Sequence, residues 1–340
     1  MNEPGLSGGR TRTARTAKPL DMHVHIVGTG AGGTGCRLRM CWWQRALSGF
    51  MLRGIGLPAQ ALRGDFDRHY VEQLLRWVRQ SSLGAVVILA QDEVYDSQGR
   101  VMEGVGAHFV PNEYVLKLAR EHEEFLAGVS IHPARPDALE ELGRCLAADA
   151  ALMKCLPNCQ NIDCNDRRFT RFWERMAEAR LPLLAHTGGE HTLPIVRPEF
   201  ADPRTLTRPL EIGVPLIAAH CAGKSGLTDP EYFPVLMELM RKFANCYADN
   251  SALNIPLRSR LLRRCLDPEV ARRLVHGSDY PVPISGGYAW LRGLIPWRTY
   301  RACAAELNPL ERDCRLKRAM GIDPAVFTRG WELVRLPKRI

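Results

Sequence analysis

The chain has 340 residues, of which 46% are hydrophobic and 24% charged, and its net charge is +9. This composition is typical of a soluble globular protein, and no apolar run approaches the roughly 18 residues that a membrane span needs. The basic residues are scattered, so we expect a small-molecule substrate rather than nucleic acid or a membrane as the partner. The length allows one large barrel domain or two ordinary domains.

The N-terminal segment, residues 1–19, is rich in glycine, threonine and arginine and holds almost no large apolar side chains. It cannot bury enough surface to offset the entropy of ordering, so we expect a disordered basic tail. The segment lacks the apolar region of a secretory signal, and the eleven cysteines are an odd number, which favours reduced thiols and a cytoplasmic location. The spacing of Cys155, Cys159 and Cys164 matches no common zinc pattern, so we expect reduced cysteines in a loop.

The first apolar run, residues 21–26, contains His23 and His25. Histidines two positions apart lie on the same face of a β-strand, and two neutral imidazoles side by side form half of a zinc-type site. The alternative is a strand with two polar side chains facing solvent. The glycine-rich stretch 28–36 follows, without the Gly-Lys-Ser/Thr of a phosphate loop, and we expect it to frame a substrate.

Short apolar strands then alternate with amphipathic helices to the end of the chain. With 21–26, the expected strands cover residues 84–90, 125–131, 151–156, 181–186, 214–220, 246–249 and 274–279. The expected helices cover 69–82, begin at Pro111 and Pro136, and then cover 169–176, 205–212, 232–243, 257–272, 309–320 and 324–335.

Repeated strand–helix units imply right-handed crossovers and parallel strands, and eight units close into a (β/α)8 barrel. A doubly wound open sheet is the alternative, but its dinucleotide signature is missing. No break in composition divides residues 20–340. We therefore expect a single α/β domain, a (β/α)8 TIM barrel, after the tail.

Polar residues close several of these strands. In a barrel the functional residues lie at the C-terminal ends of the strands, which meet on one rim. The residues at those ends are His23 and His25 in the first strand, Lys154 near the end of the fourth, His186 in the fifth, His220 in the sixth and Asp279 in the eighth. Histidines and a carboxylate gathered on one rim predict a metal site.

The ordered set His-x-His, His, His and Asp, with the eighth strand reading His-Gly-Ser-Asp-Tyr-Pro over residues 276–281, resembles the metal-dependent amidohydrolase superfamily. The form of that last motif is similar to the amidohydrolase-related branch that also contains aminocarboxymuconate semialdehyde decarboxylase. The resemblance covers nearly all of residues 20–335. It implies a barrel of the metallo-dependent hydrolase type, and it suggests a homodimer, because relatives often dimerise.

The resemblance also implies roles for single residues. His23, His25, His186 and Asp279 would hold a divalent metal, with zinc the expected ion. Asp279 would also take a proton from the metal-activated water as general base. His220 would lie beside the metal and stabilise charge on the substrate oxygen. These roles agree with the general chemistry of metal-assisted hydrolysis.

Lys154 has three readings. In binuclear relatives a carboxylated lysine on the fourth strand bridges two metals, and the position of Lys154 is compatible with that role. Otherwise it binds an anionic substrate at the rim or reaches solvent.

Other residues are candidates for substrate binding. His132 follows the third strand, where a hydrogen-bonded barrel histidine is the alternative, and Glu190 and His191 follow the fifth. We expect the remaining histidines outside these motifs to lie at the surface; they are His69, His108 and His122.

The leading hypothesis is a metal-dependent hydrolase of a small amide, lactone or ester. The alternative on the same scaffold is a non-oxidative decarboxylase, a carbon–carbon lyase. A metal-dependent deoxyribonuclease is disfavoured, because residues 151–154 lack the glutamate that this group carries on the fourth strand. A non-catalytic binding protein is disfavoured by the complete ligand set.

Overall fold

Eight parallel strands form the central sheet of the protein in a computed structural model that describes residues 15–337. The strand order is β1-β3-β5-β6-β7-β8-β9-β10, so each strand pairs with its neighbours along the chain. The strands are β1 (Leu20–His25), β3 (Ala85–Leu89), β5 (Phe125–Val129), β6 (Leu152–Cys155), β7 (Leu183–Ala185), β8 (Leu216–Ala218), β9 (Cys246–Asp249) and β10 (Leu274–Val275).

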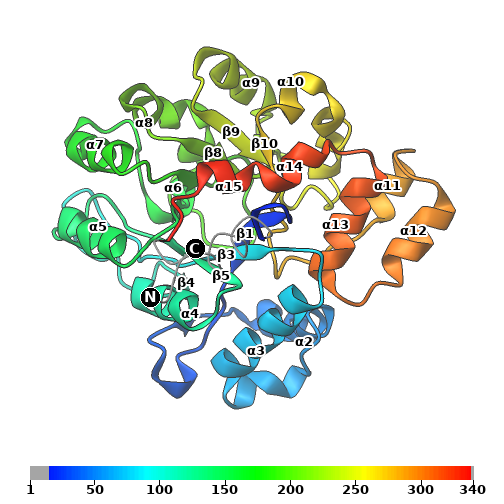
Figure 1. Cartoon of the computed structure of the whole chain (residues 1–340). Coiled ribbons are helices and arrows are strands. Elements are labelled where there is room, and N and C mark those ends of the chain that lie inside the picture. The colour runs from blue at the N-terminus through cyan, green and yellow to red at the C-terminus, as the bar shows by residue number, and fades with distance from the viewer. Residues whose placement is uncertain (1–14, 338–340) are drawn as a thin grey trace, which may run out of the picture.

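The last strand returns to the first and closes the sheet. Val24 forms a parallel bridge with Tyr280, and the amide of Met22 donates to the carbonyl of His276 at 2.9 Å. The helices lie outside the strands in a ring, as Figure 1 shows. The predicted (β/α)8 barrel is therefore confirmed, with all eight strands where the sequence placed them.

The described helices follow the expected rhythm of the sequence. They are α2 (Trp42–Gly54), α3 (Phe66–Arg79), α4 (Asn112–Glu121), α5 (Ala138–Ala147), α6 (Pro157–Gln160), α7 (Thr170–Glu178), α8 (Thr207–Ile212), α9 (Phe233–Lys242), α10 (Pro268–Ala271), α11 (Gly287–Leu291), α12 (Trp297–Ala304), α13 (Pro309–Ala319), α14 (Pro324–Thr328) and α15 (Gly330–Leu333). None of the helices between residues 15 and 337 combines the length and apolar character that crossing a bilayer requires.

Two segments differ from the prediction. The expected helix over 257–272 is broken into two 3-10 turns, η7 (Arg258–Leu261) and η8 (Arg264–Leu266), followed by α10. Asp267 lies between η8 and α10. Its side chain accepts a hydrogen bond from the amide of Glu269 and so caps the N-terminus of α10, where a new helix begins. The stretch 281–300, which holds none of the strands or helices expected from the sequence, contains α11 and the start of α12.

The barrel has two apolar cores. One lies between the strands and the surrounding helices, and the other fills the barrel interior. Trp331 and Val334 belong to the interior core, and α14 and α15 (red in Figure 1) cross the centre of the ring. The amide of Arg335 bonds to the carbonyl of Ala151, just before β6 begins. The C-terminal segment therefore closes the N-terminal end of the barrel and leaves the opposite end for the site.

Part of the expected tail is ordered against this closed end. Residues 1–14 of it lie outside the described residues, but 15–19 are described. The guanidinium of Arg15 donates to the carbonyl of Gly84 at 3.2 Å, and the indole of Trp331 donates to the carbonyl of Lys18 at 2.9 Å. Order thus extends into the segment that composition alone marked as disordered.

An irregularity in β1 determines the face of the strand on which His23 and His25 lie. The register of β1 against β3 shifts between Asp21 and Val24. Met22 belongs to the core inside the barrel, whereas Val24 belongs to the core outside it. Side chains in a regular strand alternate between the two faces, so this bulge is what brings His23 and His25 to the interior.

Candidate metal centre

Three ligand atoms converge at the C-terminal end of β1. Nε2 of His23 lies 3.2 Å from Nε2 of His25, and Oδ1 of Asp279 lies 3.2 Å from the first and 3.3 Å from the second. These atoms form one of the two groups in the described chain that could hold a metal ion. Two imidazole nitrogens and a carboxylate oxygen facing one point are a donor set suited to a divalent metal.

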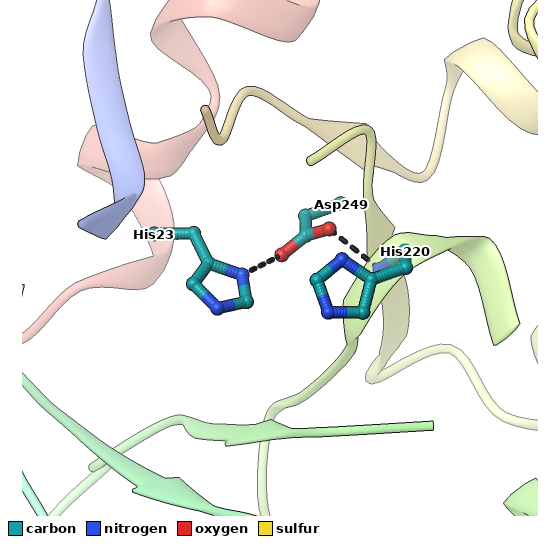
Figure 2. A group of neighbouring side chains, drawn as sticks. All are labelled: His23, His220 and Asp249. Carbon is teal, nitrogen blue, oxygen red and sulfur yellow. Dashed lines mark hydrogen bonds and ion pairs between the residues drawn. The ribbon is translucent and has the colours of Figure 1, made fainter. Parts of the chain in front are cut away.

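Asp249 connects two histidines behind this point. Its Oδ2 lies 2.7 Å from Nδ1 of His23, and its Oδ1 accepts from the amide of His220 at 2.7 Å, as Figure 2 shows. A proton on Nδ1 of His23 leaves the lone pair of Nε2 for a metal. Asp249 is not among the residues predicted for the site, although it ends β9 as the other candidates end their strands.

Ser251 sets the proton position on His220. Its hydroxyl donates to Oδ1 of Asp249 at 2.5 Å and lies 2.8 Å from Nδ1 of His220. Because the hydroxyl proton is used on Asp249, the oxygen accepts from Nδ1, and Nε2 of His220 is left with a lone pair. The ring of His220 stacks on that of His23 with centroids 5.1 Å apart.

The backbone around His220 is in an unusual conformation. His220, Cys221 and Ala222 have φ angles of 58°, 50° and 52°, and Asp279 has a φ of 67°. The left-handed region is unfavourable for residues with a Cβ, and such conformations gather at functional sites. The two strand ends that carry His220 and Asp279 are thus held in strained turns by the surrounding structure.

His186 supplies an unpartnered nitrogen. The residue is 2% exposed, and its Nε2 finds no hydrogen bond among the described residues. The nearest carboxylate oxygen is that of Glu190, at 3.7 Å. A buried polar atom without a partner is costly, and a bound cation would satisfy it. This orphaned nitrogen shows that the site fits a metal.

Burial keeps the rings of His23 and His186 neutral. It lowers the pKa of His23 to about 4, with Lys154 adding to the effect, and it lowers the pKa of His186 as well. The carboxyl of Asp279 behaves oppositely: burial would raise its pKa, but the facing His23 and His25 lower it to about 2. Neutral imidazoles and an ionised carboxylate are the metal-binding forms of these side chains.

Lys154 lies inside the ring of ligands. It is 1% exposed, and its Nζ is 3.1 Å from Nε2 of His23. Burial lowers its pKa, although Asp249 and Asp279 oppose the shift. The solvent-facing alternative is thereby wrong, whereas the metal-bridging and substrate-binding roles both remain compatible with this position.

A cavity of about 270 Å³ opens on this centre. Its polar inner end includes His25, Lys154, His186, Glu190, His220 and Asp279. Small-molecule sites are concave and largely apolar with a few convergent polar groups, which is the arrangement seen.

Two predicted substrate-binding residues do not reach this cavity. Both ring nitrogens of His132 are used by the main chain, at 2.8 Å from the carbonyl of Gln160 and 3.1 Å from the amide of Ala134. The alternative reading of His132, a hydrogen-bonded barrel histidine, is therefore what the structure shows. His191 is exposed and lies 3.2 Å from Asp229. Glu190 does line the cavity.

Two further residues near the centre escaped sequence analysis. His108, expected at the surface, lines the cavity from the two-stranded ribbon of β2 (Arg37–Leu38) and β4 (His108–Phe109). Arg258 is 5% exposed and donates to the carbonyl of Gly189 at 2.5 Å, which ties η7 to the loop carrying Glu190. Neither residue ends a strand, so the sequence offered no signal for them.

A match to a model of a known protein family identifies the family of this chain. A model described as amidohydrolase matches residues 20–296. The chain belongs to the amidohydrolase family. The predicted resemblance is thereby confirmed, and this family consists of enzymes. A comparison of the chain with curated proteins finds no match.

Solved structures share the fold of this chain at low identity. An uncharacterized TIM-barrel protein from Bordetella bronchiseptica is 17% identical with a TM-score of 0.56, over 89% of this chain and 99% of that one. A proposed 2-pyrone-4,6-dicarboxylic acid hydrolase from Pseudomonas putida is 12% identical, with a TM-score of 0.51 over 94% and 95%. A 2,6-dihydroxybenzoate decarboxylase in complex with 2,6-dihydroxybenzoate is 13% identical, with a TM-score of 0.51 over 88% and 99%. These similarities show the barrel and not the substrate.

Proposed function

We propose that this amidohydrolase is a metal-dependent hydrolase of a small carbonyl compound, an amide, lactone or ester. The observation that carries the proposal is the convergence of Nε2 of His23, Nε2 of His25 and Oδ1 of Asp279 within 3.3 Å at the floor of a cavity. His186, with its unpartnered Nε2 in the same cavity lining, completes the set of ligands.

The donor set of three imidazoles and one carboxylate favours zinc. A divalent cation held there would polarise a substrate carbonyl and make a water more acidic. Asp279, kept ionised by His23 and His25, can accept a proton from that water. Nε2 of His220 presents a lone pair to the site and can hold a proton during the reaction or bind the metal.

Metal analysis and activity measured together test the proposal. We expect purified protein to hold zinc, chelation to abolish turnover of a panel of amides, lactones and esters, and zinc to restore it. His186→Ala should lose bound metal, and Asp279→Asn should lose activity by at least about 100-fold. Glu238→Gln, an exposed residue far from the ligands in sequence, is the control. Metal content unchanged in both site variants would contradict the proposed site.

A second function, non-oxidative decarboxylation, is supported by the buried side chain of Lys154, whose amine, when protonated, could hold a substrate carboxylate at the floor of the cavity. The likeness in fold to a dihydroxybenzoate decarboxylase agrees with this alternative. Product analysis separates the two reactions. Release of carbon dioxide from an aromatic acid would contradict the hydrolase, and a cleaved product without carbon dioxide would contradict the decarboxylase.

A further inference from the structure

Above its polar floor the cavity is walled by apolar side chains. They come from the segment after β1, from α2 and the turn that follows it, from α3, and from loops at the rim. Among these residues are Val27, Met51, Leu52, Ile55, Phe66 and Val282. A substrate body that fills this space exchanges water for hydrocarbon contacts.

Charged groups are almost absent from the walls. Among the described residues that line the cavity, the basic side chains are Arg39, which is exposed, and Lys154 at the floor. A small dicarboxylic acid bound to the floor through one carboxylate would press its second carboxylate against hydrocarbon. Burying an unpaired charge in this way is strongly unfavourable.

Most polar side chains on the cavity walls form hydrogen bonds with the protein main chain. The amide of Gln44 donates to the carbonyl of Thr192 at 3.2 Å, and the hydroxyl of Ser48 donates to the carbonyl of Arg45 at 2.7 Å. The hydroxyl of Tyr70 donates to the carbonyl of His25 at 2.7 Å. These groups therefore add little polarity to the space that a substrate occupies.

His108 is the exception. Its Nε2 is buried and has no hydrogen-bond partner in the described part of the chain. The ring is hydrogen-bonded to the backbone of Ile26, and since Nε2 is free, this bond is made by Nδ1 as donor to the carbonyl. Nε2 of this cavity-lining residue is then a hydrogen-bond acceptor, and no described residue donates to it.

We propose that the substrate has an apolar alkyl or aryl body seated against α2 and α3, and an N–H or O–H group next to its reacting carbonyl that donates to Nε2 of His108. This inference rests on the proposed function for the placement of the carbonyl at His25 and Asp279. It names the substrate class as a secondary amide, or a comparable hydroxyl-bearing compound, of an apolar acid. His108 is the specificity-determining residue for the donor.

Binding of methyl alkyl ketones to the zinc-loaded protein tests the apolar body, because a ketone has the carbonyl but no bond to hydrolyse. We expect calorimetry to show Kd falling about fourfold for each added CH2 until the cavity is full. Met51→Asn, which changes a wall residue, should abolish this dependence. Phe50→Asn changes the exposed neighbour on the same helix and should leave it intact. A Kd independent of chain length, or tighter binding of succinate than of any ketone, would overturn the inference.

A matched pair of substrates tests the proposed hydrogen bond from a substrate N–H to Nε2 of His108. An N-methyl amide and a methyl ester of the same acid are similar in shape, but only the amide has an N–H. We expect the wild type to bind the amide about five- to tenfold more tightly, from KM or inhibition constants, and His108→Phe to lose that preference. Equal affinities in the wild type would overturn the role of His108.

The two proposals fail in different ways. Tight, length-dependent ketone binding with no metal-dependent hydrolysis of any amide or ester would support the apolar cavity and contradict the hydrolase. Metal-dependent hydrolysis confined to short, charged substrates would support the hydrolase and contradict the apolar cavity.

Discussion

The carboxylate of Asp249 lies 2.7 Å from Nδ1 of His23, and both residues are completely buried. Burial would raise the pKa of Asp249, but His23, the hydroxyl of Ser251 and the amide of His220 outweigh burial and hold that pKa well below its ordinary value. Asp249 is therefore ionised and fixes the proton of His23 on Nδ1. The lone pair of Nε2 then faces His25 and Asp279, so an aspartate outside the proposed ligand set orients one of its members.

Replacing Asp249 should weaken metal binding without removing a ligand. In Asp249→Asn the bond to Nδ1 of His23 loses its charge, and we expect the metal Kd to rise about 10- to 100-fold. Competition of the protein with a zinc-binding dye measures this Kd, with Glu238→Gln as the control for a lost surface carboxylate. An unchanged affinity would mean that Asp249 does not orient His23.

The position of Lys154 bears on how many metals the proposed site holds. Its Nζ lies 3.1 Å from Nε2 of His23, on the ligand side of that ring. We predict one zinc per chain in the wild type and in Lys154→Met, with a raised KM in the variant because we expect the amine to contact substrate. Elemental analysis of protein prepared in bicarbonate measures the ratio. Two metals in the wild type and one in the variant would instead establish a carboxylated, bridging lysine.

His132 should make the fold sensitive to acid. Burial lowers its pKa to about 4, helped by Arg135, although the bond to the backbone of Gln160 opposes the shift. The folded state thus takes up this proton less readily than the unfolded state, so the stabilisation is complete above pH 6.5 and is lost as the pH falls towards 4. The shift from 6.5 to about 4 corresponds to roughly 3 kcal/mol.

Urea unfolding of metal-free protein at several pH values between 7 and 4 measures this effect. His132→Asn has an amide that cannot titrate, and its free energy of unfolding should fall less steeply with acid than that of the wild type. Asp92, Arg135 and Tyr95 pack around the ring and are unchanged in the variant. Identical acid slopes for the two proteins would disprove the buried, neutral state of His132.

A buried ion pair on α13 should matter for stability. Lys317 donates to Asp313 and, at 2.7 Å, to the carbonyl of Gly277, two residues before Asp279, and the two charged side chains are each 1% exposed. Lys317→Met leaves the carboxylate of Asp313 buried and unpaired, which we expect to cost about 3–5 kcal/mol of unfolding free energy. The double variant Lys317→Met/Asp313→Leu should be more stable than the single one. Additive losses in urea unfolding would show that the pair does not act as a unit.

Sequence reasoning succeeded where one physical rule governs many residues. Few folds can bury eight apolar strands together with the apolar faces of the helices between them. In such a fold the C-terminal ends of the parallel strands meet on one rim. This rule predicted His23, His25, His186, His220 and Asp279. The structure brings together the ligand atoms of His23, His25 and Asp279, and His186 and His220 line the same cavity as His25 and Asp279. The rule failed for His132, which also follows a strand but bonds to the main chain on both nitrogens.

Residues off the strand ends could not be found in this way. His108 reaches the cavity because β4 pairs with β2 in a ribbon outside the barrel, and Arg258 reaches Gly189 because the expected helix over 257–272 is broken into short turns. Both depend on contacts between segments far apart in the chain. Local periodicity carries no information about such contacts.

The sequence by itself determined the barrel and the pair of histidines in β1, because apolar periodicity and a spacing of two are local properties. The face on which His23 and His25 lie was decided only by the tertiary structure. Plain alternation from Met22, which packs inside the barrel, would turn both rings outward, and the register shift between Asp21 and Val24 reverses this. Here β1 pairs at once with β3 and, through Val24, with Tyr280 after β10, and no local pattern records these pairings.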